Sequence, residues 1–171
     1  MIRSGLVYIV LFFVYVLAQV MLLKNLVLFD SAFCFLYVAF ILLLPFELST
    51  VVITLIGFLV GFTIDIFHSS MGIHAFATVL LSYTRNYWLS VITPQGGYDM
   101  GNTPTLSTNG VQWFLVYVLP LIFIHHFVLF FLEASSFDHF WFTMLKIISS
   151  LFFTMTVIVF LQLLVPQRRK I

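Results

Sequence analysis

Charged residues are the scarcest class in this sequence, with seven Lys or Arg and six Asp or Glu among 171 residues. A soluble domain carries about 25% charged residues, so the 8% found here cannot supply the surface of a water-soluble fold. The one cysteine, Cys34, excludes a disulfide scaffold and is expected to be a buried structural thiol. A net charge of only +1 argues against nucleic-acid binding, and the high apolar content excludes intrinsic disorder.

Long apolar runs are what the sequence has in abundance, since 63% of its residues are apolar. One membrane-spanning helix needs about 20 apolar residues, so this chain has room for about six spans with short connections. The first run follows Arg3 and is interpreted as a retained helix rather than a secretory signal. We therefore predict an all-α, polytopic membrane protein with a single transmembrane domain and six spanning helices, at residues 6–23, 32–46, 48–67, 71–85, 111–132 and 140–165.

The distribution of basic residues predicts the orientation of these spans. With both termini inside, Arg3, Arg85 and residues 168–170 face the cytoplasm, against Lys24 and Lys146 on the other side. This bias follows the positive-inside rule. The only long polar segment, residues 93–110, is rich in Gly, Pro, Ser, Thr and Asn and is predicted to be a cytoplasmic loop.

The third run has the densest set of polar and small residues within an apolar span. A projection at about 100° per residue places them within an arc of about 80°: Thr50, Thr54, Gly57, Gly61, Asp65 and His68. Gly57 and Gly61 form a GxxxG pattern, which allows another helix backbone to approach closely. This stripe is expected to face protein, and the polar face of the next span, with His74, Thr78, Ser82 and Arg85, is expected to pack against it.

Asp65 and the nearby histidines are the chemically notable residues. A carboxylate at Asp65 is compatible with a catalytic acid, a proton carrier or a ligand, but a structural residue that binds backbone amides at a helix end is favoured. Asp65, His68 and His74 do not have the spacing of an established zinc motif. His125 and His126 point about 100° apart on a helix, so one is expected to face the bundle and the other an interface. A satisfied core histidine is favoured over a proton relay.

Catalytic patterns are weakly represented in this chain. No G-x-S-x-G nucleophile elbow is present, and Asp65 is the only acid well inside a predicted span, whereas an aspartyl enzyme needs two facing carboxylates. Phosphate-binding glycine loops and haem or iron–sulfur ligand patterns are also missing. We therefore expect a protein that is not an enzyme and that uses no cofactor or metal.

The region from Pro45 to Ala75 resembles the rod shape-determining protein MreD family. The family pattern has a proline before the third helix, a G-x-x-x-G-x-x-x-D helix, a small-residue turn and then L-G-x-x-A. The matching residues here are Pro45, Gly57, Gly61, Asp65, Gly72 and Ala75, with Met71 where leucine is usual. The specific part of the resemblance covers about thirty residues.

The resemblance implies a non-enzymatic scaffold of the bacterial cell-elongation machinery, located in the inner membrane. Such proteins bind MreC and, through it, are linked to the MreB filament, to RodA and to its penicillin-binding transpeptidase partner in peptidoglycan synthesis. The family also resembles in fold the S-components of energy-coupling-factor transporters. A substrate-binding S-component is therefore the alternative function.

The predicted helix-packing or partner-binding residues are Pro45, Gly57, Gly61, Asp65, Gly72 and His74. We expect the glycine face of the third span to position helices for docking the MreC transmembrane segment. We expect the 93–110 loop to contact MreB or another cytoplasmic partner.

Overall fold

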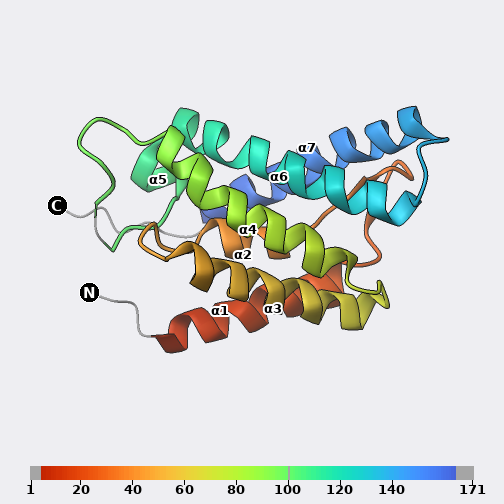
Figure 1. Cartoon of the computed structure of the whole chain (residues 1–171), viewed down its shortest axis with the longest axis horizontal. Coiled ribbons are helices and arrows are strands. Elements are labelled where there is room, and N and C mark those ends of the chain that lie inside the picture. The colour runs from red at the N-terminus through yellow and green to blue at the C-terminus, as the bar shows by residue number, and fades with distance from the viewer. Residues whose placement is uncertain (1–4, 100, 165–171) are drawn as a thin grey trace.

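The computed structural model describes residues 5–99 and 101–164 as a bundle of long helices (Figure 1). The long helices are α1 (Gly5–Ala18), α3 (Thr50–His68), α4 (Ile73–Val91), α6 (Val111–Ala134) and α7 (Phe140–Leu164). The short elements are the π-helical turn η1 (Gln19–Leu23), strands β1 (Val27–Leu28) and β2 (Ala32–Phe33), and helices α2 (Tyr37–Leu42) and α5 (Leu106–Asn109). The two strands form an antiparallel hairpin that pairs Val27 with Phe33 and Leu28 with Ala32.

Four helical segments in the described residues are long and apolar enough to cross a membrane: Gly5–Leu23, Thr50–His68, Val111–Ala134 and Phe140–Leu164. Large apolar side chains such as Phe13, Leu55 and Phe152 are more than half exposed on them. Surfaces of this kind are stable in lipid rather than in water. The chain is therefore a mostly helical membrane protein.

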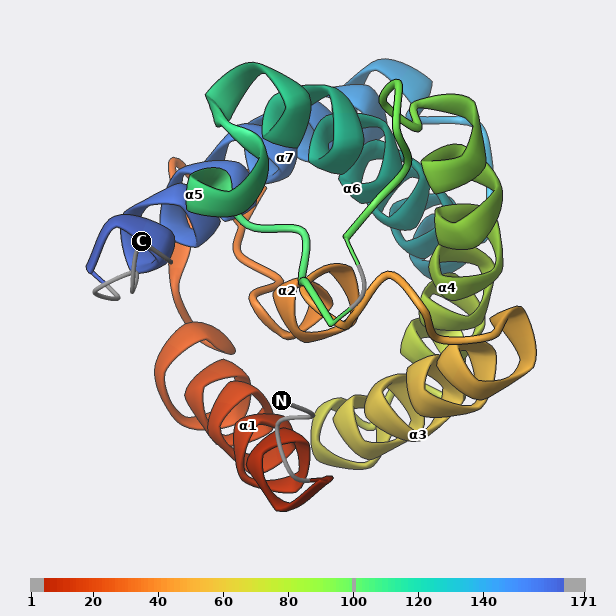
Figure 2. The same cartoon turned by 90° about the vertical axis from the view of Figure 1, so that its left-hand side faces the viewer.

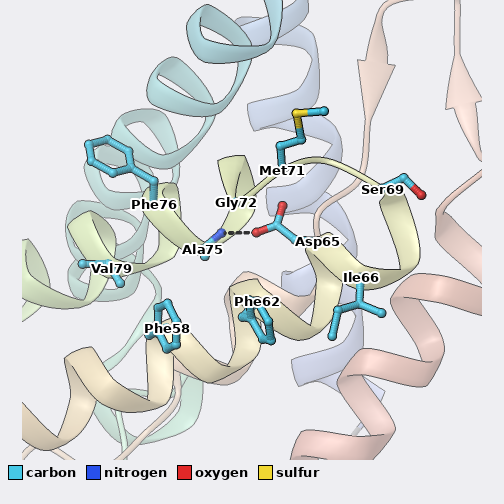
Figure 3. A pocket seen from close by; sticks show the side chains of 10 residues that line it. All are labelled: Phe58, Phe62, Asp65, Ile66, Ser69, Met71, Gly72, Ala75, Phe76 and Val79. Atoms are coloured by element: carbon cyan, nitrogen blue, oxygen red, sulfur yellow. Dashed lines mark hydrogen bonds between the residues drawn. The ribbon is translucent and has the colours of Figure 1, made fainter.

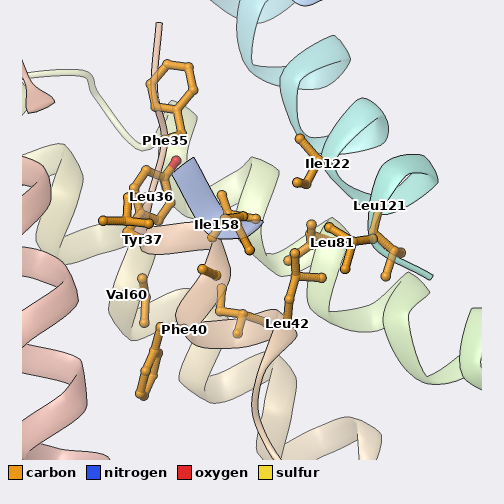
Figure 4. Packing of buried hydrophobic residues seen from close by; sticks show 14 of the residues in the cluster. Phe35, Leu36, Tyr37, Phe40, Leu42, Val60, Leu81, Leu121, Ile122 and Ile158 are labelled. Atoms are coloured by element: carbon orange, nitrogen blue, oxygen red, sulfur yellow. The ribbon is translucent and has the colours of Figure 1, made fainter. Parts of the chain in front are cut away.

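The long helices form a ring, and the short helix α2 lies inside it (Figure 2). Every residue from Tyr37 to Leu42 is buried. In the core, side chains of α2 such as Tyr37 and Leu42 lie among apolar side chains from α3, α4, α6 and α7 (Figure 4). The second apolar run of the sequence is thus enclosed by protein on all sides.

The prediction of a continuous spanning helix over residues 32–46 is wrong. This segment consists of β2, a stretch without regular secondary structure at 34–36 and the six-residue helix α2, which ends before Pro45. It nevertheless runs from the end of the bundle that holds the β1–β2 hairpin, called here the hairpin end, to the opposite end, which holds residues 92–99 and 101–110 and is called the loop end (Figure 1). Periodicity alone does not distinguish a short, fully buried apolar run from a helix, and this is why the sequence misled.

Side chains from the ring satisfy the backbone of this non-helical segment. The Phe33 N–H donates to Ser150 Oγ at 2.9 Å, and the Phe35 N–H donates to Thr154 Oγ1 at 3.1 Å. Gln19 serves two backbone groups, because its Nε2 donates to the Cys34 carbonyl at 3.0 Å and its Oε1 accepts from the Tyr37 N–H at 3.4 Å. Non-helical backbone at membrane depth is stable only when it is enclosed and hydrogen-bonded in this way.

Arg85 performs the same task at the loop end of the segment. Its guanidinium donates to the carbonyl of Leu44 at 2.5 Å and to the hydroxyl of Tyr117 at 2.8 Å, while Tyr117 donates to the Leu42 carbonyl at 2.8 Å. Arg85 is fully buried. The sequence analysis expected it on the polar face of the fourth span and counted its charge on the cytoplasmic side. It is buried because carbonyls after the end of α2 need donors inside the protein.

The polar segment after α4 covers the loop end of the bundle. Tyr98 stacks on Phe46 with ring centroids 4.2 Å apart and donates to the Leu89 carbonyl at 3.0 Å. Burial raises the pKa of the Tyr98 hydroxyl above its ordinary value. The start of α1 and the end of α7 lie at this same end (Figure 1). Residues 1–4 and 165–171, which include Arg3 and the predicted basic tail, are outside the described residues.

Replacing Gln19 by leucine is expected to destabilise the fold, because two buried backbone groups lose their partner. Each unsatisfied group costs about 1–3 kcal/mol. The matched control is Gln112→Leu, which changes an exposed glutamine of α6 and leaves the core intact. Thermal unfolding in detergent measures the effect, and equal midpoints for the two variants would show that Gln19 does not support the segment.

Candidate functional site: the α3–α4 hairpin

Gly57 and Gly61 lie against α4 rather than on an open face. A Cβ built on Gly57 would be 2.1 Å from Ser82 Oγ, and one built on Gly61 would be 2.5 Å from the Cα of Ala75. The prediction that the polar face of the fourth span packs on the glycine stripe is confirmed at Thr78 and Ser82. The glycine face is therefore filled by the protein's own α4 and is not free to dock another helix.

The hydroxyl of Thr78 joins the two helices where the glycines bring them together. It lies 2.8 Å from the carbonyl oxygen of Gly57 on α3 and 2.7 Å from that of His74 on α4, so one donor links both backbones. Close approach of backbones at small residues, combined with such hydrogen bonds, is the usual way in which membrane helices associate. The hairpin is a rigid unit of the ring.

Asp65 holds the start of α4 with its carboxylate. Oδ1 accepts from the N–H of His74 at 3.0 Å, and Oδ2 accepts from the N–H of Ala75 at 2.8 Å. The hydroxyl of Ser70 also donates to Oδ1 at 2.6 Å. These are backbone donors that the first turn of a helix leaves without partners, and the positive end of the helix dipole favours the negative charge. Asp65 thus binds backbone amides at a helix end.

The cluster of Asp65, Ser70 and His74 has the composition of a catalytic triad but not its geometry. His74 Nδ1 lies 2.8 Å from the Ser70 hydroxyl and 3.1 Å from Asp65 Oδ1. In a triad the serine faces one ring nitrogen and the carboxylate faces the other, so that the histidine takes the proton of the serine while the carboxylate orients the ring. Here both partners meet the same nitrogen, and the serine also bonds the carboxylate directly. The cluster therefore lacks the arrangement of a triad, and its hydrogen bonds close the turn between α3 and α4.

The turn between the two helices is tight and has three residues with positive φ, Ser69, Met71 and Gly72. Ser69 has φ 56° and ends α3, while Gly72 has φ 91° and precedes α4. Glycine adopts this conformation without a steric penalty, so a glycine at 72 suits the sharp entry into α4. Lys24 donates to the Phe67 carbonyl at 2.6 Å and so places a cation at the negative end of the α3 dipole.

A small polar pocket lies inside the hairpin end of the ring. Its volume is about 120 Å³, and its polar lining includes Gln19, Lys24, His68, His74 and Glu133. His68 Nε2 is buried and has no hydrogen-bond partner among the described residues. Pockets for drug-sized ligands measure about 300–1,000 Å³, so this one is small by comparison.

The two adjacent histidines of α6 are both fully buried, which corrects the expectation that one of them faces an interface. His125 Nε2 lies 2.9 Å from the hydroxyl of Tyr37. His126 Nδ1 donates to the Ile122 carbonyl at 2.8 Å, and its Nε2 faces the Thr154 hydroxyl at 3.3 Å. Both side chains point inward, toward residues 34–36 at the centre of the ring. There Phe35 contacts both imidazole rings.

The remaining predicted site residue, Pro45, lies at the loop end, far along the bundle from the turn at 69–72. Its carbonyl is 3.4 Å from the guanidinium of Arg85. No group of three or more His, Cys, Asp or Glu side chains that could hold a metal ion occurs within residues 5–99 and 101–164. The sequence analysis did not identify the structural importance of Gln19, Ser150 and Thr154, although a polar residue inside an apolar helix was a usable signal.

Comparison of the chain with protein-family profiles, with curated proteins and with solved structures finds no match.

Gly61→Ala is expected to destabilise the protein by about 1–3 kcal/mol, because the new methyl group forces two packed backbones apart. Gly5→Ala is the matched control, since a Cβ at Gly5 meets nothing within 4 Å. Unfolding midpoints in detergent should fall for Gly61→Ala alone. An unchanged midpoint for Gly61→Ala would contradict the close packing of α3 on α4.

Proposed function

We propose that this chain is a non-enzymatic integral membrane component of the bacterial cell-elongation machinery, which binds MreC and scaffolds peptidoglycan synthesis. In this proposal MreC links the chain to MreB, to RodA and to the penicillin-binding transpeptidase partner of RodA. The protein spans the inner membrane several times with both termini in the cytoplasm.

The observation that carries the proposal is that most residues of the family resemblance, all except Pro45, gather in one structural unit, the α3–α4 hairpin. Gly57, Gly61 and Asp65 on α3 contact α4 directly, and Gly72 forms the turn between the two helices. All of these residues serve helix packing or backbone capping. A hairpin built in this way suits a protein whose work is to hold helices in a fixed arrangement.

The arrangement of the ends supports the proposed orientation. The start of α1, the end of α7 and the segment at 92–110 share the loop end, which we propose faces the cytoplasm (Figure 1). The segment folds onto the bundle: Phe46 N–H donates to the Asn102 carbonyl at 3.4 Å, and Leu106 N–H donates to Gln162 Oε1 at 2.9 Å. An ordered cytoplasmic cap of this kind offers a surface to MreB or another inner partner.

A substrate-binding S-component of an energy-coupling-factor transporter is the second candidate. The polar pocket at the hairpin end favours it, because Lys24 and Glu133 bring both charges to its lining. Its volume of about 120 Å³ weighs against a vitamin-sized substrate. A small molecule that co-purifies tightly with the protein and is identified by mass spectrometry would favour this candidate over the scaffold.

Co-expressed MreC should co-purify with the tagged full-length chain from bacterial membranes in mild detergent. The control is an MreC variant whose transmembrane helix is replaced by that of an unrelated single-span protein. We expect retention of MreC and loss of the chimera, because association within the membrane depends on helix contacts. Failure of MreC to co-purify at normal expression of both proteins would refute the proposed function.

A further inference from the structure

A groove opens on the outer side of the α3–α4 hairpin (Figure 3). It lies near the end of the bundle that holds the β1–β2 hairpin. Its volume is about 750 Å³, and its walls are mainly apolar, with Phe58, Phe62 and Ile66 from α3 facing Phe76 and Val79 from α4. The glycine contact holds the two helices together beneath it. The groove is therefore separate from the glycine face, which α4 already fills.

A carboxylate lies at one end of this apolar groove. Asp65 is one of its lining residues, although only 6% of Asp65 is exposed. The two oxygens of the carboxylate are used unequally. Oδ1 has three partners, the Ser70 hydroxyl, the His74 backbone N–H and His74 Nδ1, whereas Oδ2 accepts only from the Ala75 N–H among the described residues. A carboxylate oxygen has capacity for more than one hydrogen bond. An occupant with a donor would gain a charge-assisted hydrogen bond in an apolar setting, where such bonds are strong.

We propose that this groove receives a transmembrane helix of a partner protein. The helix places apolar side chains between the phenylalanines of α3 and α4 and a hydrogen-bond donor, such as a hydroxyl, amide or ammonium group, at Asp65. The inference rests on the proposed function and locates its contact on the outer side of the hairpin. The α3 wall from Phe58 to Ile66 extends for about 12 Å, which is more than two helical turns.

Other occupants of the groove fit the observations less well. Two copies of this chain related by a twofold axis through the groove would bring two Asp65 carboxylates together, and no lining residue is a cation. Another part of the same chain is a further possible occupant, but the start of α1 and the end of α7 lie at the loop end, away from the groove (Figure 1). An acyl chain fills an apolar groove but offers no donor to the carboxylate. A partner helix satisfies both the apolar walls and the carboxylate.

Site-specific photo-crosslinking tests the location. Benzoylphenylalanine is introduced at Phe62 or at Phe76, which are 49% and 57% exposed in the groove, in the full-length chain co-expressed with MreC. Phe152 is the matched control, since it is 63% exposed on α7, which packs against α6 and β2 rather than against the hairpin (Figure 2). We expect crosslinks to the transmembrane helix of MreC from both groove positions and none from the control.

A second variant measures the strength of the contact. Phe62→Ala combined with Phe76→Ala should lower the amount of co-purified MreC by about tenfold, as expected for the loss of aromatic anchors worth more than 1 kcal/mol. Phe152→Ala combined with Phe160→Ala, which truncates two exposed phenylalanines of α7, should leave it unchanged. Equal thermal midpoints for the two double variants exclude misfolding as the cause.

The outcomes separate the two proposals. If MreC co-purifies but crosslinks only from Phe152, or if the groove positions crosslink only to lipid or to a second copy of the chain, the groove is not the docking site and the proposed function remains. If MreC does not co-purify at all, both proposals fail. Crosslinks to MreC from Phe62 and Phe76, together with reduced co-purification of MreC with the Phe62→Ala, Phe76→Ala variant, support both proposals.

Discussion

Backbone hydrogen bonding inside the membrane is the constraint on which the rest of this structure depends. Lipid offers no partner to a peptide group, so a segment that is not helical must be enclosed and satisfied by protein. Residues 33–36 form such a segment, and α2 continues it along the centre of the ring. The polar side chains that serve this backbone come from several elements of the ring: Gln19 in η1, Arg85 in α4, Tyr117 in α6, and Ser150 and Thr154 in α7.

The α3–α4 hairpin closes the ring by a different physical means. Its two helices approach at Gly57 and Gly61, and Asp65 fixes the start of the second helix through two backbone amides. Gly57 and Gly61 are both buried in this internal contact with α4. The outer side keeps the large side chains, among them Phe58, Phe62 and Phe76, which line the groove together with Asp65. Internal packing and external docking thus use opposite sides of the same hairpin.

Much of this arrangement was predictable from the residues, and the exceptions have physical reasons. Long apolar runs located α1, α3, α6 and α7, and the GxxxG spacing identified the face of α3 that packs on α4. The second apolar run was wrongly predicted to be a continuous spanning helix, because apolar composition indicates burial but does not specify the backbone conformation. Arg85 was placed on the polar face of the fourth span and counted as a charge on the cytoplasmic side. Its partners were not predicted, because its donors bind carbonyls at the end of a central segment that no sequence pattern indicates.

The most direct test of this account is the hydrogen-exchange rate of the backbone amides in the central segment, measured by mass spectrometry in detergent or nanodiscs. The account predicts that the peptide covering residues 33–42 exchanges as slowly as the middle of α6, because its amides are buried and bonded. Exchange as fast as that of residues 93–99 would show that the segment is open to water. That result would contradict a ring of helices built around a shielded central segment, residues 33–42.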